Sequence, residues 1–362
     1  MKILFVITGL GLGGAERQVV DLADRMVSCG HSVSIAYMTG SALVRPTSEN
    51  INIFGLEAKK TLFGFLGVLL KLRGLVKKIK PDVVHSHMVH ANILSRLARL
   101  TCRIPRLICT AHSTNEGGRL RMLAYRITAP LADVSTNVSV EAVAAFVKQG
   151  ATKPGEMMAV PNGIDTNRFV RSDAARNRLR ELEGVTDADK VFLAVGRLNV
   201  AKDYPNLLRA FTEVAKEIKS VRLWIVGDGD LRDELNIEVN RMQLSSKVKF
   251  LRIQKNVDEW MSAADVFVLS SAWEGFGLVV AEAMACEKVV VATDAGGVKE
   301  VLGDCGFLVP VRDSVALSKA LQSAIQLPID EVYELGMRGR RRVLENFSLD
   351  HAVSRWLKIY EA

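Results

Sequence analysis

KILFVITGLGLGGAERQVV, residues 2–20, is an apolar run, a glycine-rich turn and the start of a helical pattern in direct succession. Gly9, Gly11 and Gly14 satisfy the G-x-G-x-x-G fingerprint of dinucleotide binding after a strand and before a helix. A nicotinamide cofactor also requires an acidic residue about 20 positions further on. The matching stretch, AYMTG (residues 36–40), contains none. We therefore expect this turn to contact a phosphate or a sugar, with a plain tight turn as the alternative.

Strand-like apolar runs alternate with helix-period segments along the whole chain, which predicts an α/β protein with parallel, doubly wound sheets. In the first half the expected strands are Lys2–Ile7, Ser32–Tyr37, Asp82–Ser86, Arg106–Thr110, Asp133–Thr136 and Met157–Val160. In the second half they are Val191–Val195, Arg222–Val226, Lys247–Leu251, Asp265–Leu269 and Val289–Ala292. No short repeat or low-complexity tract interrupts this alternation.

With 362 residues, the chain exceeds the usual size of one hydrophobic core, so two domains are expected. The polar stretch Asp165–Lys190 is poor in strand formers and is the candidate linker. We place one Rossmann-like domain at residues 1–165 and a second at 166–345. Residues 346–362 are expected to form a C-terminal helix that could cross back to the first domain. Ligands of such folds bind at the carboxyl ends of the strands, here in a cleft between the domains.

Positive charge is concentrated in the first half of the chain. Residues 1–170 carry a net charge of +10, against −2 for residues 171–362. Between Lys59 and Arg126, 14 basic residues accompany only Asp82 and Glu116. Such a surface attracts polyanions, so nucleic acid, acidic polymers and an anionic membrane all remain open.

The five cysteines form no C-x-x-C pair, and we expect them to be small buried residues in a reducing compartment. The N-terminus is predicted to be a strand rather than a signal peptide. The longest apolar stretch, Leu62–Leu70, is too short to span a bilayer, so a soluble or surface-bound protein is expected. Residues 62–80 combine a helical apolar period with a basic end, which fits either a membrane-surface helix or a helix packed on the first sheet.

The segment SSAWEGFGLVVAEAMA (residues 270–285) follows an expected strand and opens a helix. Gly275 and Gly277 free the backbone, so amides at the helix N-terminus can point at an anion, and the helix dipole adds to the attraction. Glu274 before the helix and Glu282 within it would bracket a diphosphate, each taking sugar hydroxyls on its own side. The alternative is that Glu274 is an N-terminal cap and Glu282 a solvated helix residue.

Arg197 and Lys202 lie just after the first strand of the second half. Two cations at a strand end can neutralise a pyrophosphate that gains charge as it leaves. The alternative for this pair is ordinary ion pairing at the surface.

Taken together, these motifs resemble those of family 4 glycosyltransferases of the GT-B fold, especially bacterial surface-polysaccharide hexosyl and N-acetylhexosaminyl transferases. The resemblance covers essentially the whole chain. It is carried by GGAE (13–16), DVVHSH (82–87), TAH (110–112), PNGID (161–165), GR (196–197) with Lys202, GDG (227–229) with LR (231–232), and the 274–282 block. GT-B proteins consist of two Rossmann-like domains facing each other across a cleft.

The resemblance implies roles for individual residues. Catalytic roles are implied for Glu274, His112, Arg197 and Lys202. Arg197 and Lys202 would hold the diphosphate of a nucleotide sugar, Glu274 the donor sugar, Glu282 the ribose, and the amides of Gly277 and Leu278 the distal phosphate. His112 would lie beside the donor sugar. Gly14, Ile253 and Val257 complete the donor set, and Gly13, Glu16 and His87 form the acceptor side.

The chain departs from the family pattern at Arg252, where relatives commonly have a glycine in the loop whose backbone contacts the base. The base preference is therefore open.

Two features could suggest a metal. Asp228-Gly229-Asp230 looks like a D-x-D site, but it matches a turn into a helix in this family. His85, His87 and His90 could suggest zinc, but no cysteine or acidic partner lies nearby in the sequence. We expect no metal site and no cofactor.

The resulting expectation is a metal-independent, retaining glycosyltransferase that moves a hexose or N-acetylhexosamine from a UDP-sugar to an acceptor hydroxyl. The expected acceptor is a polyprenyl-diphosphate-linked saccharide or a glycolipid of O-antigen, capsule or lipopolysaccharide synthesis. The protein would then bind the inner face of the cytoplasmic membrane peripherally. A nucleotide-sugar epimerase is the alternative, since fold does not fix chemistry. A nucleic-acid binder is supported only by the net charge and lacks an aromatic-rich basic motif.

Overall fold

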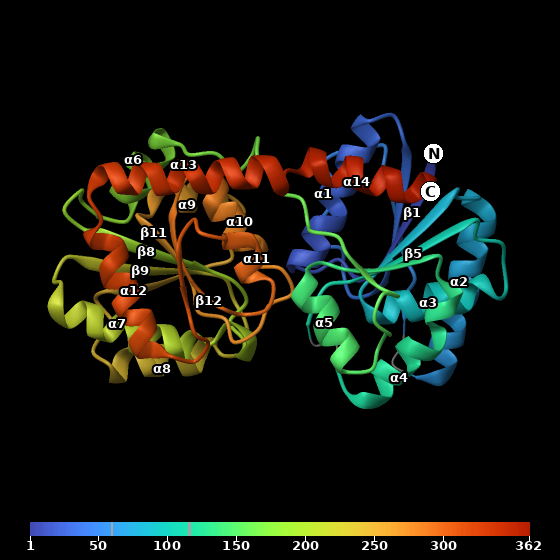
Figure 1. The fold of residues 1–362 in the computed structure, drawn as a ribbon, viewed down its shortest axis with the longest axis horizontal. Helices are drawn as coiled ribbons and strands as arrows, with labels where there is room; N and C mark the ends of the chain where they lie inside the picture. Colours follow the sequence, from blue (N-terminus) through green and yellow to red (C-terminus); the bar gives the residue numbers. More distant parts are fainter. Residues whose placement is uncertain (59–60, 115–116) are drawn as a thin grey trace. The chain divides into compact units, whose positions relative to one another are not determined.

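Two parallel sheets organise the computed structural model, which describes residues 1–58, 61–114 and 117–362. The chain divides into two compact units (Figure 1). Unit 1 comprises Met1–Gly163 and Leu349–Ala362, and unit 2 comprises Ile164–Ser348. The sequence placed the boundaries at 165/166 and 345/346.

Unit 1 contains a seven-stranded sheet in the order β3-β2-β1-β4-β5-β6-β7, with every neighbouring pair parallel. Its strands are β1 Lys2–Gly9, β2 Ser32–Thr39, β3 Asn52–Gly55, β4 Val83–His87, β5 Arg106–Ala111, β6 Val134–Asn137 and β7 Met158–Ala159. Its helices are α1 Gly14–Ser28, α2 Leu62–Ile79, α3 Val89–Arg99, α4 Arg119–Thr128, the 3₁₀ turn η1 Ala129–Leu131, α5 Val140–Lys148 and α14 Leu349–Glu361.

Unit 2 repeats this plan with six parallel strands in the order β10-β9-β8-β11-β12-β13. The strands are β8 Lys190–Val195, β9 Val221–Val226, β10 Val248–Arg252, β11 Val266–Leu269, β12 Val289–Thr293 and β13 Phe307–Val309. The helices are α6 Asp173–Leu182, η2 Val200–Lys202, α7 Tyr204–Glu217, α8 Arg232–Arg241, α9 Val257–Ala263, α10 Leu278–Ala285, α11 Val298–Leu302, α12 Ser314–Gln326 and α13 Ile329–Asn346.

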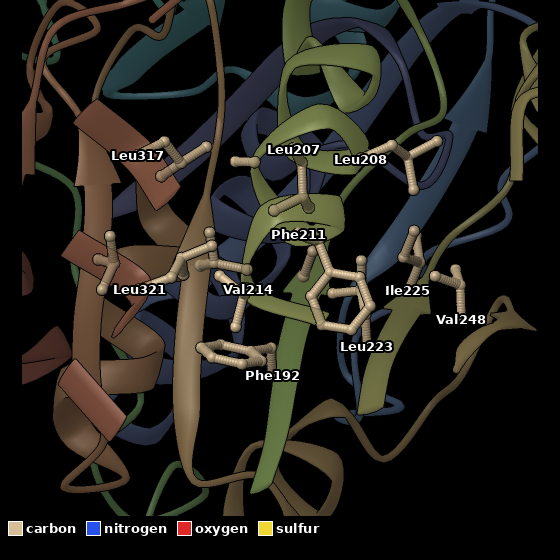
Figure 2. Close-up of a cluster of buried hydrophobic side chains, with 14 of the residues drawn as sticks. Phe192, Leu207, Leu208, Phe211, Val214, Leu223, Ile225, Val248, Leu317 and Leu321 are labelled. Atoms are coloured by element: carbon tan, nitrogen blue, oxygen red, sulfur yellow. The ribbon is translucent and has the colours of Figure 1, made fainter. Parts of the chain in front are cut away.

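The strands form because continuous runs of β-branched and aromatic residues are buried between helices, as parallel sheets require. One core of unit 2 lies where α7 and α12 cover the sheet (Figure 2). Its labelled side chains are Phe192, Leu207, Leu208, Phe211, Val214, Leu223, Ile225, Val248, Leu317 and Leu321. Fully burying one side chain of this kind contributes about 1.5–3 kcal/mol.

The eleven strands expected from the sequence are all present, and two strands were missed. The missed strands, β3 and β13, have four and three residues and lie at the edges of their sheets. In a run this short, the alternation of apolar and polar residues that identifies a strand cannot be recognised. An edge strand also needs less continuous apolar sequence than a central one.

The expected linker, Asp165–Lys190, is for the most part not a linker, which corrects the sequence analysis. It contains α6, whose N-cap Ser172 accepts a hydrogen bond from the amide of Ala175. Arg176 and Arg180 on this helix form ion pairs with Asp265 at 2.7 and 3.3 Å, and Arg180 is almost fully buried. Because buried Arg180 and partly exposed Arg176 share this carboxylate, they attach the segment to unit 2.

The last helix, α14, belongs to unit 1 although it follows unit 2 in the chain. Its residues Ala352, Val353, Trp356 and Tyr360 are buried in the same core as β1 and α1. Arg106 of β5 also donates to the carbonyl of Ile359 at 2.9 Å. The C-terminal segment therefore completes a hydrophobic core that covers the first sheet.

Helix α2, over the basic apolar segment 62–80, packs mainly inward. Val68, Leu72, Leu75 and Val76 are buried in a core of unit 1. This favours the packed-helix alternative for that segment.

Lys59, Lys60 and Glu116 of the positive region lie outside the described residues. Within the described ranges, no helix combines the length and apolarity needed to cross a membrane.

All five cysteines are free thiols. Cys109, Cys286 and Cys305 are buried and Cys102 is half-buried, but Cys29 is exposed, contrary to expectation. Burial raises the pKa of Cys286 to about 12, so this thiol stays protonated and inert at neutral pH.

Candidate functional site

In both sheets the strand order reverses at the centre, between β1 and β4 in unit 1 and between β8 and β11 in unit 2. Such switch points are where doubly wound folds bind ligands, beyond the carboxyl ends of the strands. Gly13 and Gly14 follow β1, and His87 ends β4. Lys202 follows β8, and Glu274 follows β11. Each unit therefore presents expected site residues at its own switch point.

In unit 2 the structure brings Lys202 and Glu274 together. The Lys202 ammonium donates to Oε1 of Glu274, and the hydroxyl of Ser271 donates to the same oxygen at 2.7 Å. The two side chains are only 19% and 15% exposed. A partly buried, hydrogen-bonded ion pair is oriented more firmly than one at the open surface. The pair is the centre of the candidate site in unit 2.

Backbone and hydroxyl contacts fix the loop after β8 to the loop after β11. Ser270 donates through its hydroxyl to the carbonyl of Lys202 at 2.8 Å, and the amide of Ala272 donates to the carbonyl of Ala201 at 2.8 Å. The buried hydroxyl of Tyr204 donates to the carbonyl of Gly196 at 3.1 Å. Burial, with a smaller effect from the Glu274 carboxylate, raises the pKa of Tyr204, so the hydroxyl stays a donor.

Glycines allow these loops to approach closely. A Cβ at Gly196 would lie 2.9 Å from Cε of Lys202, so the lysine chain passes directly over this residue. Cβ atoms at Gly227 and Gly229 would lie 2.0 Å from the carbonyl oxygen of Gly196 and 2.4 Å from that of Leu198. The loop after β8 therefore rests on the glycine turn after β9 with no room for side chains.

Helix α10 begins beside this pair, and its N-cap is Gly277 rather than Glu274. Gly277 has φ +91°, which glycine adopts without strain, and a Cβ there would lie 3.1 Å from Cγ2 of Val298. The first amides of an α-helix have no partner within the helix, so they and the dipole attract an anion. Leu278 is the first residue of α10, and half-buried Glu282 lies one turn further on.

The other expected cation, Arg197, is exposed and forms no ion pair with any residue that the structure describes. Lys202, by contrast, forms an ion pair, but a partly buried one rather than the surface pair that was its alternative, and its partner is Glu274, the carboxylate expected to hold the donor sugar. The sequence analysis assigned separate roles to Lys202 and Glu274 and did not predict their contact. The sequence analysis also missed Ser271, which donates to Glu274, and Tyr204, which donates to the carbonyl of Gly196.

The loop after β10 has an unusual backbone at Arg252. Its φ is +57°, in the left-handed region, and the register of β10 against β9 shifts between Phe250 and Arg252. The amide of Gly227 donates to the carbonyl of Arg252 at 2.8 Å. The conformation explains why glycine suits this position. Ile253, 53% exposed, follows it, and half-buried Val257 begins α9.

The D-x-D sequence is built as a turn. Asp228 accepts from the amide of Gly229 at 2.9 Å and pairs with Arg232 at 3.3 Å and Arg252 at 3.7 Å. The Gly229 amide, with Arg232 and Arg252, lowers the pKa of this carboxyl. Across the described residues, no three or more His, Cys, Asp or Glu side chains are grouped so that they could hold a metal ion.

In unit 1, three histidines lie on neighbouring strands: His85 and His87 in β4, and His112 directly after β5. His85 contacts the hydroxyl of Tyr360 through Nδ1 and that of Thr110 through Nε2, both at 2.7 Å. His87 Nδ1 lies 2.9 Å from His112 Nε2. Both ring nitrogens of His85 are thus occupied, and His90 is exposed on α3, so the zinc alternative does not fit this arrangement.

The histidine cluster is neutral at physiological pH. Burial lowers the pKa of His112 to about 4 and lowers the pKa values of His85 and His87 well below the usual range. Nε2 of His87 is buried and has no hydrogen-bond partner among the described residues. A neutral imidazole can donate or accept a hydrogen bond near a reacting sugar without adding a charge. Tyr360, 275 positions from His85, was not foreseen.

The glycine turn after β1 is partly covered by Glu16. A Cβ at Gly13 would lie 2.3 Å from Oε2 of this glutamate, so the carboxylate lies against the turn. Gly13 is the N-cap of α1 and Gly14 its first residue. Gly13, Gly14 and Glu16 are therefore neighbours at the switch point of unit 1, as the sequence motif implies.

Two family models match the chain. One, described as "Glycosyltransferase Family 4", matches residues 12–168, and the other, described as "Glycosyl transferases group 1", matches residues 189–326. The first lies in unit 1 apart from its last five residues, and the second lies in unit 2. Both descriptions name transferases, which confirms the expected class of enzyme and gives no support to the epimerase.

Curated relatives match over most of their length. The alpha-maltose-1-phosphate synthase of Mycolicibacterium smegmatis is 30% identical, over 77% of this chain and 78% of the relative. A Campylobacter jejuni protein named N-acetylgalactosamine-N,N'-diacetylbacillosaminyl-diphospho-undecaprenol 4-alpha-N-acetylgalactosaminyltransferase is 27% identical, over 90% of each chain. The Escherichia coli UDP-Gal:alpha-D-GlcNAc-diphosphoundecaprenol alpha-1,3-galactosyltransferase is 27% identical, over 81% of this chain and 78% of the relative.

Among solved structures, Anabaena HepE in complex with UDP and glucose superimposes with a TM-score of 0.87. The match covers 100% of this chain and 99% of HepE at 22% identity, and so shows a shared fold. The expected GT-B class, built from two Rossmann-like units, is confirmed. On the two model matches and the M. smegmatis relative, the chain belongs to the group 1 (family 4) glycosyltransferases.

Proposed function

We propose that this glycosyltransferase moves a hexose or N-acetylhexosamine from a UDP-sugar to a hydroxyl of a lipid-linked saccharide, with retention at the anomeric carbon. The observation that carries the proposal is the Lys202–Glu274 pair beside the Gly277-capped start of α10. A cation, a carboxylate and free helix amides at one switch point suit a sugar diphosphate. HepE, whose fold this chain shares, was solved with UDP and glucose.

In the proposed donor complex, Lys202 and Arg197 neutralise the diphosphate and the amides of Gly277 and Leu278 bind its distal phosphate. Glu274 is then free to accept hydrogen bonds from the hydroxyls of the transferred sugar. Glu282 binds the ribose, while the backbone at Ile253 and Val257 contacts the base. Gly14 lets the donor approach the turn after β1. Because Arg197 and Lys202 supply the positive charge, the proposal requires no metal cofactor.

The proposed reaction is a same-face substitution. The bond from the anomeric carbon to the diphosphate oxygen breaks, and a bond to the acceptor oxygen forms on the same side. The departing phosphate oxygen takes the proton of the acceptor hydroxyl, so UDP leaves protonated. Lys202, Arg197 and the helix amides stabilise the charge that develops on the diphosphate. The proposal assigns neutral His112 a role beside the donor sugar, as the family resemblance implies.

A double displacement would need a carboxylate nucleophile close to the anomeric carbon. The proposal assigns Glu274, which accepts a hydrogen bond from Ser271, to the sugar hydroxyls instead. Trapping a covalent glycosyl-enzyme would contradict the same-face route.

The acceptor is proposed to be a polyprenyl-diphosphate-linked saccharide of surface-polysaccharide synthesis, bound near Gly13, Glu16 and His87. The C. jejuni and E. coli relatives carry diphospho-undecaprenol acceptors in their names. The protein would then act at the inner face of the cytoplasmic membrane. Unit 1 carries most of the excess positive charge, which suits an anionic membrane surface.

The donor test is a thermal-shift screen of UDP-glucose, UDP-galactose, their N-acetylamino forms and GDP-mannose, since a ligand of the native state raises the melting temperature. UDP-sugars should stabilise the chain, and Lys202→Ala should reduce the shift. NMR of the product should show the donor's anomeric configuration, and a chelator should leave turnover unchanged. Stabilisation by GDP-mannose alone, or an inverted product, would contradict the proposal.

A further inference from the structure

A row of four aromatic rings crosses unit 1 from its last helix to the switch point of its sheet. The row starts at Trp356 of α14, continues through His85 and His87 of β4 and ends at His112. The centroids of successive rings lie 4.4, 4.0 and 5.2 Å apart. The first three side chains are at most 3% exposed, whereas His112 is half-buried. Of these four rings, only that of His112 is therefore placed to touch a substrate.

Hydrogen bonds fix both ring nitrogens of His85. Burial raises the pKa of Tyr360, so its hydroxyl keeps its hydrogen, and among the described residues Nδ1 of His85 is the acceptor for it at 2.7 Å. His85 therefore carries its own hydrogen on Nε2 and donates it to the hydroxyl of Thr110 at 2.7 Å. Thr110 in turn donates to the hydroxyl of Thr136, also at 2.7 Å. This direction of donation leaves His85 in a single neutral tautomer.

His87 is oriented by ring packing and by one hydrogen bond. Its Nδ1 lies 2.9 Å from Nε2 of His112, while its own Nε2 is buried and has no partner in the described part of the chain. The rings of Phe5 and His85 pack against it, with centroids 5.5 and 4.0 Å away. A ring with such neighbours in a close-packed interior cannot turn freely. The packing therefore keeps Nδ1 of His87 directed at His112.

The row does not form a proton relay. His85 and His87 stack on each other, and no hydrogen bond joins them among the described side chains. Burial lowers the pKa of both histidines well below the usual range, so neither stores a proton at neutral pH. His87 is only 1% exposed, which keeps it from contacting an acceptor directly. Its one hydrogen-bonded contact is with His112.

We propose that His87 is a positioning residue that sets the tautomer and the orientation of the His112 imidazole, and that α14 holds His87 in place through Tyr360 and His85. A neutral imidazole carries one hydrogen, so the bond at Nε2 decides whether Nδ1 of His112 donates or accepts. A hydrogen bond between His112 and the donor sugar then has to use Nδ1. The inference rests on the proposed function for the place of His112 beside that sugar.

The first test compares His87→Asn with His87→Leu, two side chains of similar size. Asparagine keeps an amide near the position of Nδ1, whereas leucine forms no hydrogen bond. With a UDP-sugar as donor, His87→Leu should lower kcat about 10- to 100-fold, because a misplaced group slows the reaction, while the donor KM stays within about threefold. His87→Asn should lie within about fivefold of the wild-type kcat. Equal kcat values for the two variants would overturn the proposal.

A double-mutant cycle tests whether His87 acts through His112. His112→Leu removes the imidazole that His87 holds, so adding His87→Leu to it should lower kcat by less than about twofold more. Losses that multiply in the double variant would contradict the role. In ¹⁵N NMR, His112 should show one neutral tautomer in the wild type and an average of both tautomers in His87→Leu. The same single tautomer in the variant would also overturn the proposal.

The contribution of α14 has a matched control. Tyr360→Phe removes the hydroxyl that fixes His85 and should lower kcat about three- to tenfold. Tyr125→Phe removes the hydroxyl of another buried tyrosine of unit 1, which accepts from Asn92 at 3.4 Å, and should leave kcat within about twofold. Equal kcat values for these two variants would exclude α14 from the role.

These measurements separate the inference from the proposed function. NMR of the protein without donor reports the tautomer of His112 whether or not a UDP-sugar binds. If His87→Leu loses the single tautomer but the wild type consumes no UDP-sugar, the proposed function fails and the tautomer assignment stands. If the wild type consumes a UDP-sugar and His87→Leu has the same kcat, the positioning role fails and the proposed function stands.

Discussion

The ammonium group of Lys202 is paired with the carboxylate of Glu274, across two loops that leave adjacent strands of unit 2. Each residue is assigned to a different part of the donor, the diphosphate for Lys202 and the sugar for Glu274. On the proposed function, the pair separates when a donor binds, and the diphosphate replaces the carboxylate as the partner of Lys202. The two residues should consequently respond differently to substitution.

Glu274→Gln should reduce turnover about 100-fold or more, because the transition state loses a charged hydrogen-bond acceptor on the sugar. UDP affinity should stay within about threefold or rise, since Lys202 loses a competing partner. Lys202→Ala should weaken UDP binding about 10- to 100-fold. Calorimetry with UDP and steady-state kinetics measure the two effects. Unchanged turnover in Glu274→Gln would remove this residue from the mechanism.

Gly196→Ala should weaken donor binding without unfolding the protein. The new Cβ would lie 2.9 Å from Cε of Lys202, and the flexible lysine chain can move aside at little cost in stability. We expect UDP affinity to fall about three- to tenfold as Lys202 is displaced, with stability changed by less than about 0.5 kcal/mol. Gly118→Ala is the control, because its Cβ would meet nothing within 4 Å. Equal effects of the two substitutions on UDP binding would contradict the explanation.

Stability should fall with acidification because His112 is held neutral. The pKa of His112 is about 4 in the folded protein, against 6.5 for a histidine in water. The unfolded chain therefore binds this proton first, so the stability is present above pH 6.5 and is lost as the pH falls to about 4. The complete loss amounts to about 3 kcal/mol for this group.

Urea unfolding at several pH values checks this sign. His112→Gln keeps a hydrogen-bonding side chain beside His87 but does not titrate, so its free energy of unfolding should depend less steeply on pH. Some slope remains, because His85 and His87 also have lowered pKa values. An identical slope in the variant would show that His112 titrates normally.

Arg252→Gly should stabilise unit 2 by about 0.5–1 kcal/mol, because φ +57° is unfavourable for a residue with a Cβ. The lost ion pair with Asp228 matters little, since the Arg252 side chain is 70% exposed. Arg252→Ala removes the guanidinium but retains the Cβ and should not stabilise the fold. Chemical denaturation compares the variants. A similar gain from alanine would exclude backbone strain as the cause.

The sequence predicts the fold well where strands are buried on both faces. Runs such as those of β8 and β12 are continuous and apolar, and their assignment needs no tertiary information. The edge strands β3 and β13 carry too short a pattern for this. Helix α6 was not predicted because its buried residues include Arg180. A charged residue indicates an exposed linker in the sequence, and only the structure shows that Arg180 is paired with Asp265.

The candidate site is predictable residue by residue but not as a set of contacts. The motifs single out Lys202 and Glu274, yet their pairing joins positions 72 apart and depends on the neighbouring strands β8 and β11. Ser271 lies inside a recognised segment and still gives no signal of its role. Tyr360 contacts His85 only because α14 returns to unit 1, and no local pattern reveals that partner.

That return of α14 also bears on the order in which the protein is made. Domains generally fold as they are synthesised, the N-terminal one first. Here the core of unit 1 lacks Trp356 and Tyr360 until residues 349–361 have left the ribosome, whereas all of unit 2 precedes them. The core of unit 1 is thus translated early and completed last, and the nascent protein cannot finish unit 1 before unit 2 has been translated.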